Sequence, residues 1–220
     1  CNIKNYYTKP KYYDVVATGT REVGEDELQN VYDVIQEQEK TNADWVLFFE
    51  APLDEHTKIR TNQMYLESDI VRYVIQLDFD GTYEGANSLS LEERVKTATR
   101  LMPSLEGVGM VAHLSNKAGF KDVYPNHIAL RLYVELERPT GNKALCKIFK
   151  IYGLGSDIGL DHTLYSARRK HLIQRPSISG DNTPLEFPIR SLKIPGKKLS
   201  LEKMVVSQHY KNALARIEVE

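Results

Sequence analysis

Hydrophobic and polar residues alternate along the middle of the chain with two different periods. Runs rich in Val, Ile, Leu and Tyr, as expected of strands, cover residues 70–80, 107–114 and 127–136. Apolar residues at helical spacing cover 90–102 and 140–152. With a further strand expected at 170–174, the order is strand, helix, strand, strand, helix, strand. This order predicts an α+β fold with an RRM-like or ferredoxin-like antiparallel sheet at its core.

The two ends of the chain predict additions to this core. Residues 25–40 have the apolar spacing of a helix and 45–50 form an apolar run typical of a buried strand, which together predict an N-terminal α/β extension. Residues 200–217 predict an amphipathic C-terminal helix. We expect a main domain over 1–198, with an N-terminal lobe of about 1–69 and an RRM-like lobe of about 70–198, and a helix over 199–220 that packs back or links to a further domain.

Composition places the chain among globular proteins of a reducing compartment. Of its 220 residues, 41% are hydrophobic and 27% charged, which argues against disorder. No apolar run approaches the roughly 20 residues that span a bilayer, so no membrane partner is expected. The two cysteines form no C-x-x-C pair, which predicts neither a disulfide framework nor a zinc ribbon. We expect a cytoplasmic protein, of a bacterium or a phage-infected host.

Charge is distributed unevenly along the chain although the formal net charge is only −1. Residues 22–55 contain eleven acids and one basic residue, whereas 166–198 contain eight Lys or Arg and two acids. A basic C-terminal third favours contact with phosphates. The alternative is that solvated faces of the protein simply differ in sign.

The sharpest candidate for chemistry is the segment Asp78-Phe79-Asp80-Gly81 at the end of an apolar strand. Side chains alternate along a strand, so Asp78 and Asp80 point to the same side. Two neighbouring carboxylates repel each other, and Mg²⁺ or Mn²⁺ removes that cost because these ions prefer carboxylate oxygen. The pair therefore predicts a divalent-metal site, with an ordinary solvated turn as the alternative.

The predicted topology brings other polar residues to the same rim. In the ferredoxin-like order the first strand lies between the third and the fourth, and the second runs parallel to the first. The end of the first strand then lies close to segments that carry polar side chains, namely Ser115, Lys117, His127, Asp161, Arg168 and Arg169. His127 and Arg131, four apart on a predicted strand, share a face, and Arg131 suits phosphate binding. Taken singly, His127 and the loop of Ser115 are also compatible with a structural role.

The ordered set of these segments resembles the archaeo-eukaryotic primase superfamily, and most closely its phage and plasmid primase-polymerases. The matching segments are IQLDFDG, HLSNKAG, HIALRLYVELERP and IGLDHTLYSARRKHLIQRP, which span about residues 71–178. Here a loop separates Ser115 from His127, whereas the family often places its Ser and His in one short motif. His113 is a second candidate for the family's histidine, and Asp157 is a second candidate for its third carboxylate.

The resemblance implies a DNA primase or polymerase that joins nucleoside triphosphates on a single-stranded DNA template with Mg²⁺ or Mn²⁺. Asp78, Asp80 and Asp161 would be the catalytic metal ligands. Ser115, Lys117, His127 and Arg131 would bind the triphosphate. DNA would be bound by basic residues near the C-terminus, namely Arg168, Arg169, Lys170 and Arg175. A replicative helicase, in the same chain or separate, is an expected partner.

Two other classes of protein share part of this pattern. Glycosyltransferases also use D-x-D at a strand end to bind a sugar nucleotide through a metal. A non-catalytic RRM-like module would bind nucleic acid on aromatic residues of its sheet, for which Tyr73 and Tyr133 are the candidates. Metal-dependent binding of a nucleoside triphosphate distinguishes the enzyme from the module.

Overall fold

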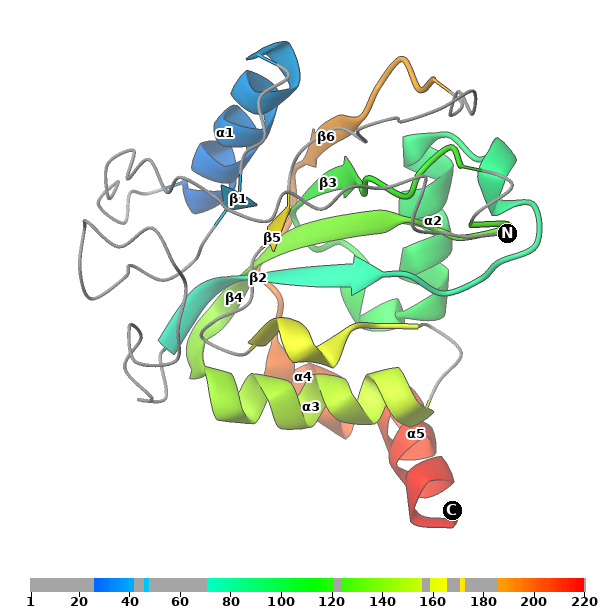
Figure 1. Cartoon of the computed structure of the whole chain (residues 1–220). Coiled ribbons are helices and arrows are strands. Elements are labelled where there is room, and N and C mark those ends of the chain that lie inside the picture. The colour runs from blue at the N-terminus through cyan, green and yellow to red at the C-terminus, as the bar shows by residue number, and fades with distance from the viewer. Residues whose placement is uncertain are drawn as a thin grey trace, which may run out of the picture.

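A four-stranded antiparallel sheet forms the centre of the protein, with helices on both of its faces (Figure 1). The computed structural model describes residues 26–41, 46–47, 71–120, 124–155, 159–165, 171–172 and 186–219. The order of the strands in the sheet is β2-β4-β3-β6. Their bounds are Val71–Phe79 (β2), Met110–Leu114 (β3), Leu130–Gly141 (β4) and Ser191–Ile194 (β6). This is the α+β class with the antiparallel core that the apolar pattern predicts.

The helices follow the predicted segments closely. They are α1 (Glu27–Thr41), α2 (Leu91–Leu101), α3 (Asn142–Gly155), α4 (Leu201–Val206) and α5 (Gln208–Val219). The predicted capping box is present, since the Ser90 hydroxyl accepts a hydrogen bond from the Glu93 amide and the Glu93 carboxylate accepts one from the Ser90 amide. The predicted C-terminal helix is broken at Ser207, whose extended ψ of 150° ends α4. No helix in the described part of the chain is long and apolar enough to cross a membrane.

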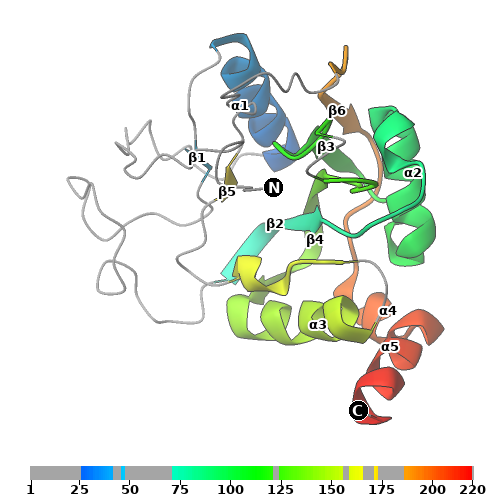
Figure 2. The same cartoon turned by 45° about the vertical axis from the view of Figure 1, so that its right-hand side comes forward.

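The two faces of the sheet have opposite character. One face is apolar and packs against α2 and α3, with side chains such as Leu77, Leu132 and Ala112 completely buried. The other face carries polar side chains, and α1 packs over part of it through a small cluster that includes Ile35, Val111 and Tyr133. Figures 1 and 2 show the sheet between α1 on one side and α3 with α4 and α5 on the other.

The fourth strand of the sheet does not lie where the ferredoxin-like order placed it. The expected strand at 170–174 is the short β5 (His171–Leu172), which pairs with β1 (Val46–Leu47) in a separate two-stranded sheet. The fourth strand is instead β6, which pairs with β3. Polar and apolar residues alternate in this strand, and Leu192 and Ile194 pack against the core. This short segment between two prolines therefore forms an amphipathic strand at the edge of the sheet.

The end of β2 nevertheless has neighbours on both sides. On one side β4 pairs with it along its length. On the other side the described residues form a single antiparallel bridge between Phe79 and Leu160, just after α3. Because β2 and β3 both run antiparallel to β4, they are parallel to each other, and their carboxyl ends meet at one edge of the sheet. That edge is where the predicted site lies.

Candidate functional site

A row of polar side chains crosses all four strands on the face that is not packed against α2 and α3. The register places Asp78 of β2 opposite Arg131 of β4, Arg131 opposite His113 of β3, and His113 opposite Ser191 of β6. Directly opposed residues have their side chains on one face of a sheet. All four are at least nine-tenths buried, so this row is an interior polar array rather than a solvated surface.

Asp78 is the acid at the inner end of the site. Burial raises the pKa of its carboxyl to about 6, and the negative charges of Asp80 and Asp161 also raise it, while Arg131 and Lys117 oppose the shift. Arg131 Nε lies 3.6 Å from Asp78 Oδ2. Arg131, Lys117 and Asp161, from three other segments, thus lie close enough to the end of β2 to affect the pKa of Asp78.

Asp80 lies two residues further on and is partly exposed. Its Oδ2 forms an ion pair with Lys117 Nζ, from the loop that follows β3. That loop is anchored at the buried Ser115, whose amide donates to the Ala129 carbonyl over 2.8 Å and whose hydroxyl accepts from the Lys117 amide over 3.3 Å. The parallel course of β2 and β3 therefore brings Lys117 to Asp80, as predicted.

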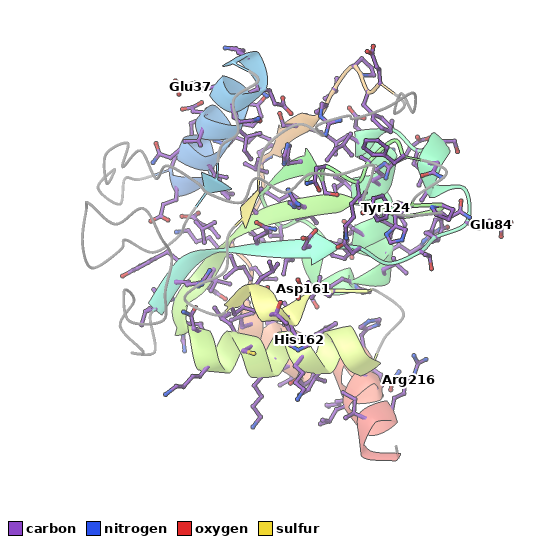
Figure 3. The ribbon with its side chains drawn as sticks, in the orientation of Figure 1. Glu37, Glu84, Tyr124, Asp161, His162 and Arg216 are labelled. Atoms are coloured by element: carbon purple, nitrogen blue, oxygen red, sulfur yellow. The ribbon has the colours of Figure 1, made fainter. Side chains whose placement is uncertain are left out.

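Asp161 reaches the same place through its backbone. The Asp161 amide donates to the Asp78 carbonyl over 3.2 Å, and the Asp80 amide donates to the Gly159 carbonyl over 3.2 Å. Figure 3 shows Asp161 between the end of β2 and α3. Its side-chain Oδ1 accepts hydrogen bonds from the amide and hydroxyl of Thr163, over 2.9 and 2.7 Å. The third predicted acid thus lies beside the first, although the two are 83 positions apart in the sequence.

Gly159 makes this approach possible. Its φ of +63° is in the left-handed region, and a Cβ at this position would lie 2.5 Å from both the Cα and the amide nitrogen of Gly81. Side chains do not tolerate such contact with a backbone, so the two chain segments come this close only because residue 159 is glycine. The motif Asp-x-Asp-Gly and the distant Gly159 therefore belong to one structural unit.

The donor atoms present suit a hard divalent cation. Asp78 Oδ1 and Asp80 Oδ1 are buried and have no hydrogen-bond partner in the structure, an unfavourable state for carboxylate oxygens that a bound cation relieves. At the same time, the described residues contain no group of three or more His, Cys, Asp or Glu side chains arranged to hold a metal ion. The acids are instead neutralised by the chain's own cations, Arg131 at Asp78 and Lys117 at Asp80.

Of the two candidate histidines, His113 lies in a strand of the sheet and His127 does not. His127 precedes β4 and forms an isolated bridge with Thr82, because Asn126 and Ala129 take positive φ values of 59° and 48° and interrupt the extended chain. The prediction that His127 and Arg131 share a strand face is therefore wrong. His113, the second candidate, is the histidine that lies next to Arg131 in the sheet.

The environments of these histidines favour their neutral forms. Burial, with the nearby positive charges of Arg131 and Arg190, holds the pKa of His113 well below its usual value. Burial also lowers the pKa of His127, and the nearby charges of Asp80 and Lys117 affect this pKa as well. The His127 ring is edge-on to Tyr124 at 5.5 Å between centroids, and Lys117 Nζ lies 5.6 Å from the centre of the Tyr124 ring.

Sequence reasoning missed the contribution of α1. Ser191 Oγ donates to Glu39 Oε2 over 3.0 Å and accepts from Gln36 Nε2 over 2.5 Å, and Glu39 Oε1 lies 3.6 Å from His113 Nε2. The polar row thus continues into the N-terminal helix. In the sequence, the only indication of this contact is that α1 is acidic whereas the C-terminal third is basic.

Several predicted residues lie outside the described part of the chain. They are the DNA-binding candidates Arg168, Arg169, Lys170 and Arg175, and the alternative carboxylate Asp157. Their predicted roles stay predictions.

Comparisons with protein-family models, with curated proteins and with solved structures found no match. The function of this chain is therefore inferred from the geometry of the site and the chemistry of its residues.

Proposed function

We propose that this protein is a template-directed nucleotidyltransferase of the primase-polymerase kind, which joins nucleoside triphosphates on single-stranded DNA with the help of Mg²⁺ or Mn²⁺. The observation that carries the proposal is the hydrogen bond from the Asp161 amide to the Asp78 carbonyl. It brings the third acid of the motif set beside the end of β2, where Arg131 and Lys117 also lie.

The roles of the residues follow from their positions. Asp78 and Asp80 would hold the cations through their buried, unpartnered oxygens, with Asp161 beside them. When bound, such cations lower the pKa of an attacking hydroxyl and stabilise the pyrophosphate leaving group. Arg131 is fixed in the sheet next to Asp78, and Lys117 lies on the loop beside Asp80. Both would bind phosphate oxygens of the nucleotide, together with Ser115 and the neutral His127.

The structure counts against a simple RRM-like binding module. Such modules stack bases on aromatic side chains exposed on the sheet. Tyr133 is completely buried in the cluster that α1 forms on this face. Tyr73 is exposed, but without Tyr133 the sheet does not offer the expected aromatic pair.

A primer-synthesis assay on single-stranded DNA with Mg²⁺ or Mn²⁺ tests the proposal. We expect the wild-type protein to make or extend primers and Asp80→Asn to lose at least a hundredfold in rate, since transition-state charge stabilisation of this kind is worth about that much. Glu106→Gln, an exposed acid in a turn after α2, is the matched control and should keep full activity. Product formation by Asp80→Asn at the wild-type rate would contradict the proposal. A protein that hydrolyses sugar nucleotides and makes no primer would be a glycosyltransferase instead.

A further inference from the structure

Each of the two strand-end acids has its own internal cation, and the two cations are held very differently. Arg131 is on β4, in register between Asp78 and His113, and its side chain is 8% exposed. Lys117 is in the turn after β3, and its side chain is 32% exposed. A guanidinium buried on the face of the sheet has little room to move. A lysine on a loop, by contrast, needs only to rotate its flexible stem.

The partner of Lys117 is also the acid best placed to exchange its cation. Asp80 is 29% exposed, so a hydrated ion reaches it more readily than the buried Asp78. Its Oδ1 has no hydrogen-bond partner, while its Oδ2 is occupied by Lys117. A divalent ion that uses Asp80 meets the positive charge of Lys117 at contact distance, and the two repel each other.

On these observations, which rest on the proposed function, we propose that Lys117 is an exchangeable internal counter-ion. A divalent cation takes its place on Asp80, and the released ammonium binds the phosphates of the nucleotide. In the resting protein the pair keeps an otherwise uncompensated carboxylate neutralised.

The exchange has a thermodynamic consequence for the two ligands. A nucleotide that draws Lys117 toward its phosphates leaves Asp80 open to the cation, and a cation on Asp80 frees Lys117 for the nucleotide. Each ligand therefore tightens the binding of the other, by the same factor in both directions. Direct contact between cation and phosphate contributes to that factor, and the proposal attributes a separate share of it to Lys117.

The test measures binding without turnover. Mn²⁺ affinity is obtained from the electron paramagnetic resonance signal of the free ion, with and without an α,β-methylene nucleoside triphosphate. For Lys117→Met without nucleotide, we expect Mn²⁺ affinity to rise about tenfold, as loss of an adjacent, partly screened charge predicts. The factor by which the nucleotide analogue tightens Mn²⁺ binding should shrink. Lys117→Arg keeps the charge and should bind Mn²⁺ no more tightly than the wild type, and Lys211→Met, exposed on α5, should match the wild type in both measurements.

The outcomes separate this inference from the proposed function. If the wild type binds Mn²⁺ and the analogue, but Lys117→Met binds Mn²⁺ no more tightly, the counter-ion role is overturned and the nucleotidyltransferase proposal stands. If neither the wild type nor Lys117→Met binds Mn²⁺, both are overturned. Binding of Mn²⁺ by Lys117→Met under conditions where the wild type binds little would support the exchange directly.

Discussion

Substituting Gly159 tests the contact that brings Asp161 to the end of β2. Two physical costs add in Gly159→Ala. The left-handed φ of +63° costs an alanine about 1 kcal/mol. The new methyl group would lie 2.5 Å from the backbone of Gly81, and relieving such overpacking typically costs about 1–3 kcal/mol. We therefore expect the free energy of unfolding to fall by about 2–4 kcal/mol.

A second glycine separates the two costs. Gly85 has a similar φ of +77°, but a Cβ built there meets nothing within 4 Å. Gly85→Ala should thus show only the backbone cost of about 1 kcal/mol. Urea denaturation followed by circular dichroism gives both values. The difference between the two variants measures the close approach of residues 159 and 81.

The same pair of variants connects the fold to the site. Any shift that relieves the overlap moves the backbone that holds Asp161 beside Asp78, so Gly159→Ala should weaken Mn²⁺ binding while Gly85→Ala leaves it unchanged. If Gly159→Ala were no more destabilising than Gly85→Ala, the two segments would not be in contact, and the reasoning that joins Asp161 to the acid pair would be refuted.

Further predictions address individual residues. Because the pKa of Asp78 is raised to about 6 from 3.8, the unfolded chain loses this proton first, so the stability contribution of Asp78 is greatest below pH 4 and is lost as pH rises through 6. The difference in unfolding free energy between Asp78→Asn and wild type should therefore shift by about 2 kcal/mol in favour of the variant between pH 4 and 8, and a flat difference in urea titrations would contradict this. Ser90→Ala removes the capping box of α2 and should cost about 1 kcal/mol in the same assay, whereas a cost near zero would show that the cap contributes nothing. Glu39→Ala removes the acid that accepts from Ser191 and should lower the melting temperature more than Asp33→Ala, an exposed position on α1; equal values would mean that the polar row does not hold α1. Reversing the charges of Arg168 and Arg169 should weaken binding to single-stranded DNA and reduce its salt slope by about 1 to 2, and an unchanged slope would remove them from the DNA path.

The sequence predicts those features that depend on local pattern. The capping box of Ser90 and the acid pair at the end of β2 could be predicted because each depends on only a few neighbouring residues. The first depends on local hydrogen bonding and the second on the alternation of side chains along a strand. The placement of Lys117 could also be predicted, since parallel first and second strands end at the same edge whatever the position of the fourth strand.

Features that depend on long-range strand pairing or on single backbone dihedral angles could not be predicted from the sequence. β6 pairs with β3, and its four alternating residues are too short a pattern to show from the sequence which strand it joins. His127 leaves the strand because Ala129 takes a positive φ, which is uncommon for alanine and has no signature in the sequence. The glycine at 159 is visible in the sequence, but its contact with Gly81 is a property of the folded chain.

Whether the acids at the end of β2 bind a divalent cation beside a nucleotide is decided by a crystal of the protein soaked with Mn²⁺ and an α,β-methylene nucleoside triphosphate, with anomalous diffraction data collected near the manganese edge. We expect an anomalous peak within coordination distance of Asp78 and Asp80, near Asp161, with Lys117 turned from Asp80 toward the phosphates. Strong nucleotide density with no manganese at these acids, or manganese bound elsewhere, would contradict it.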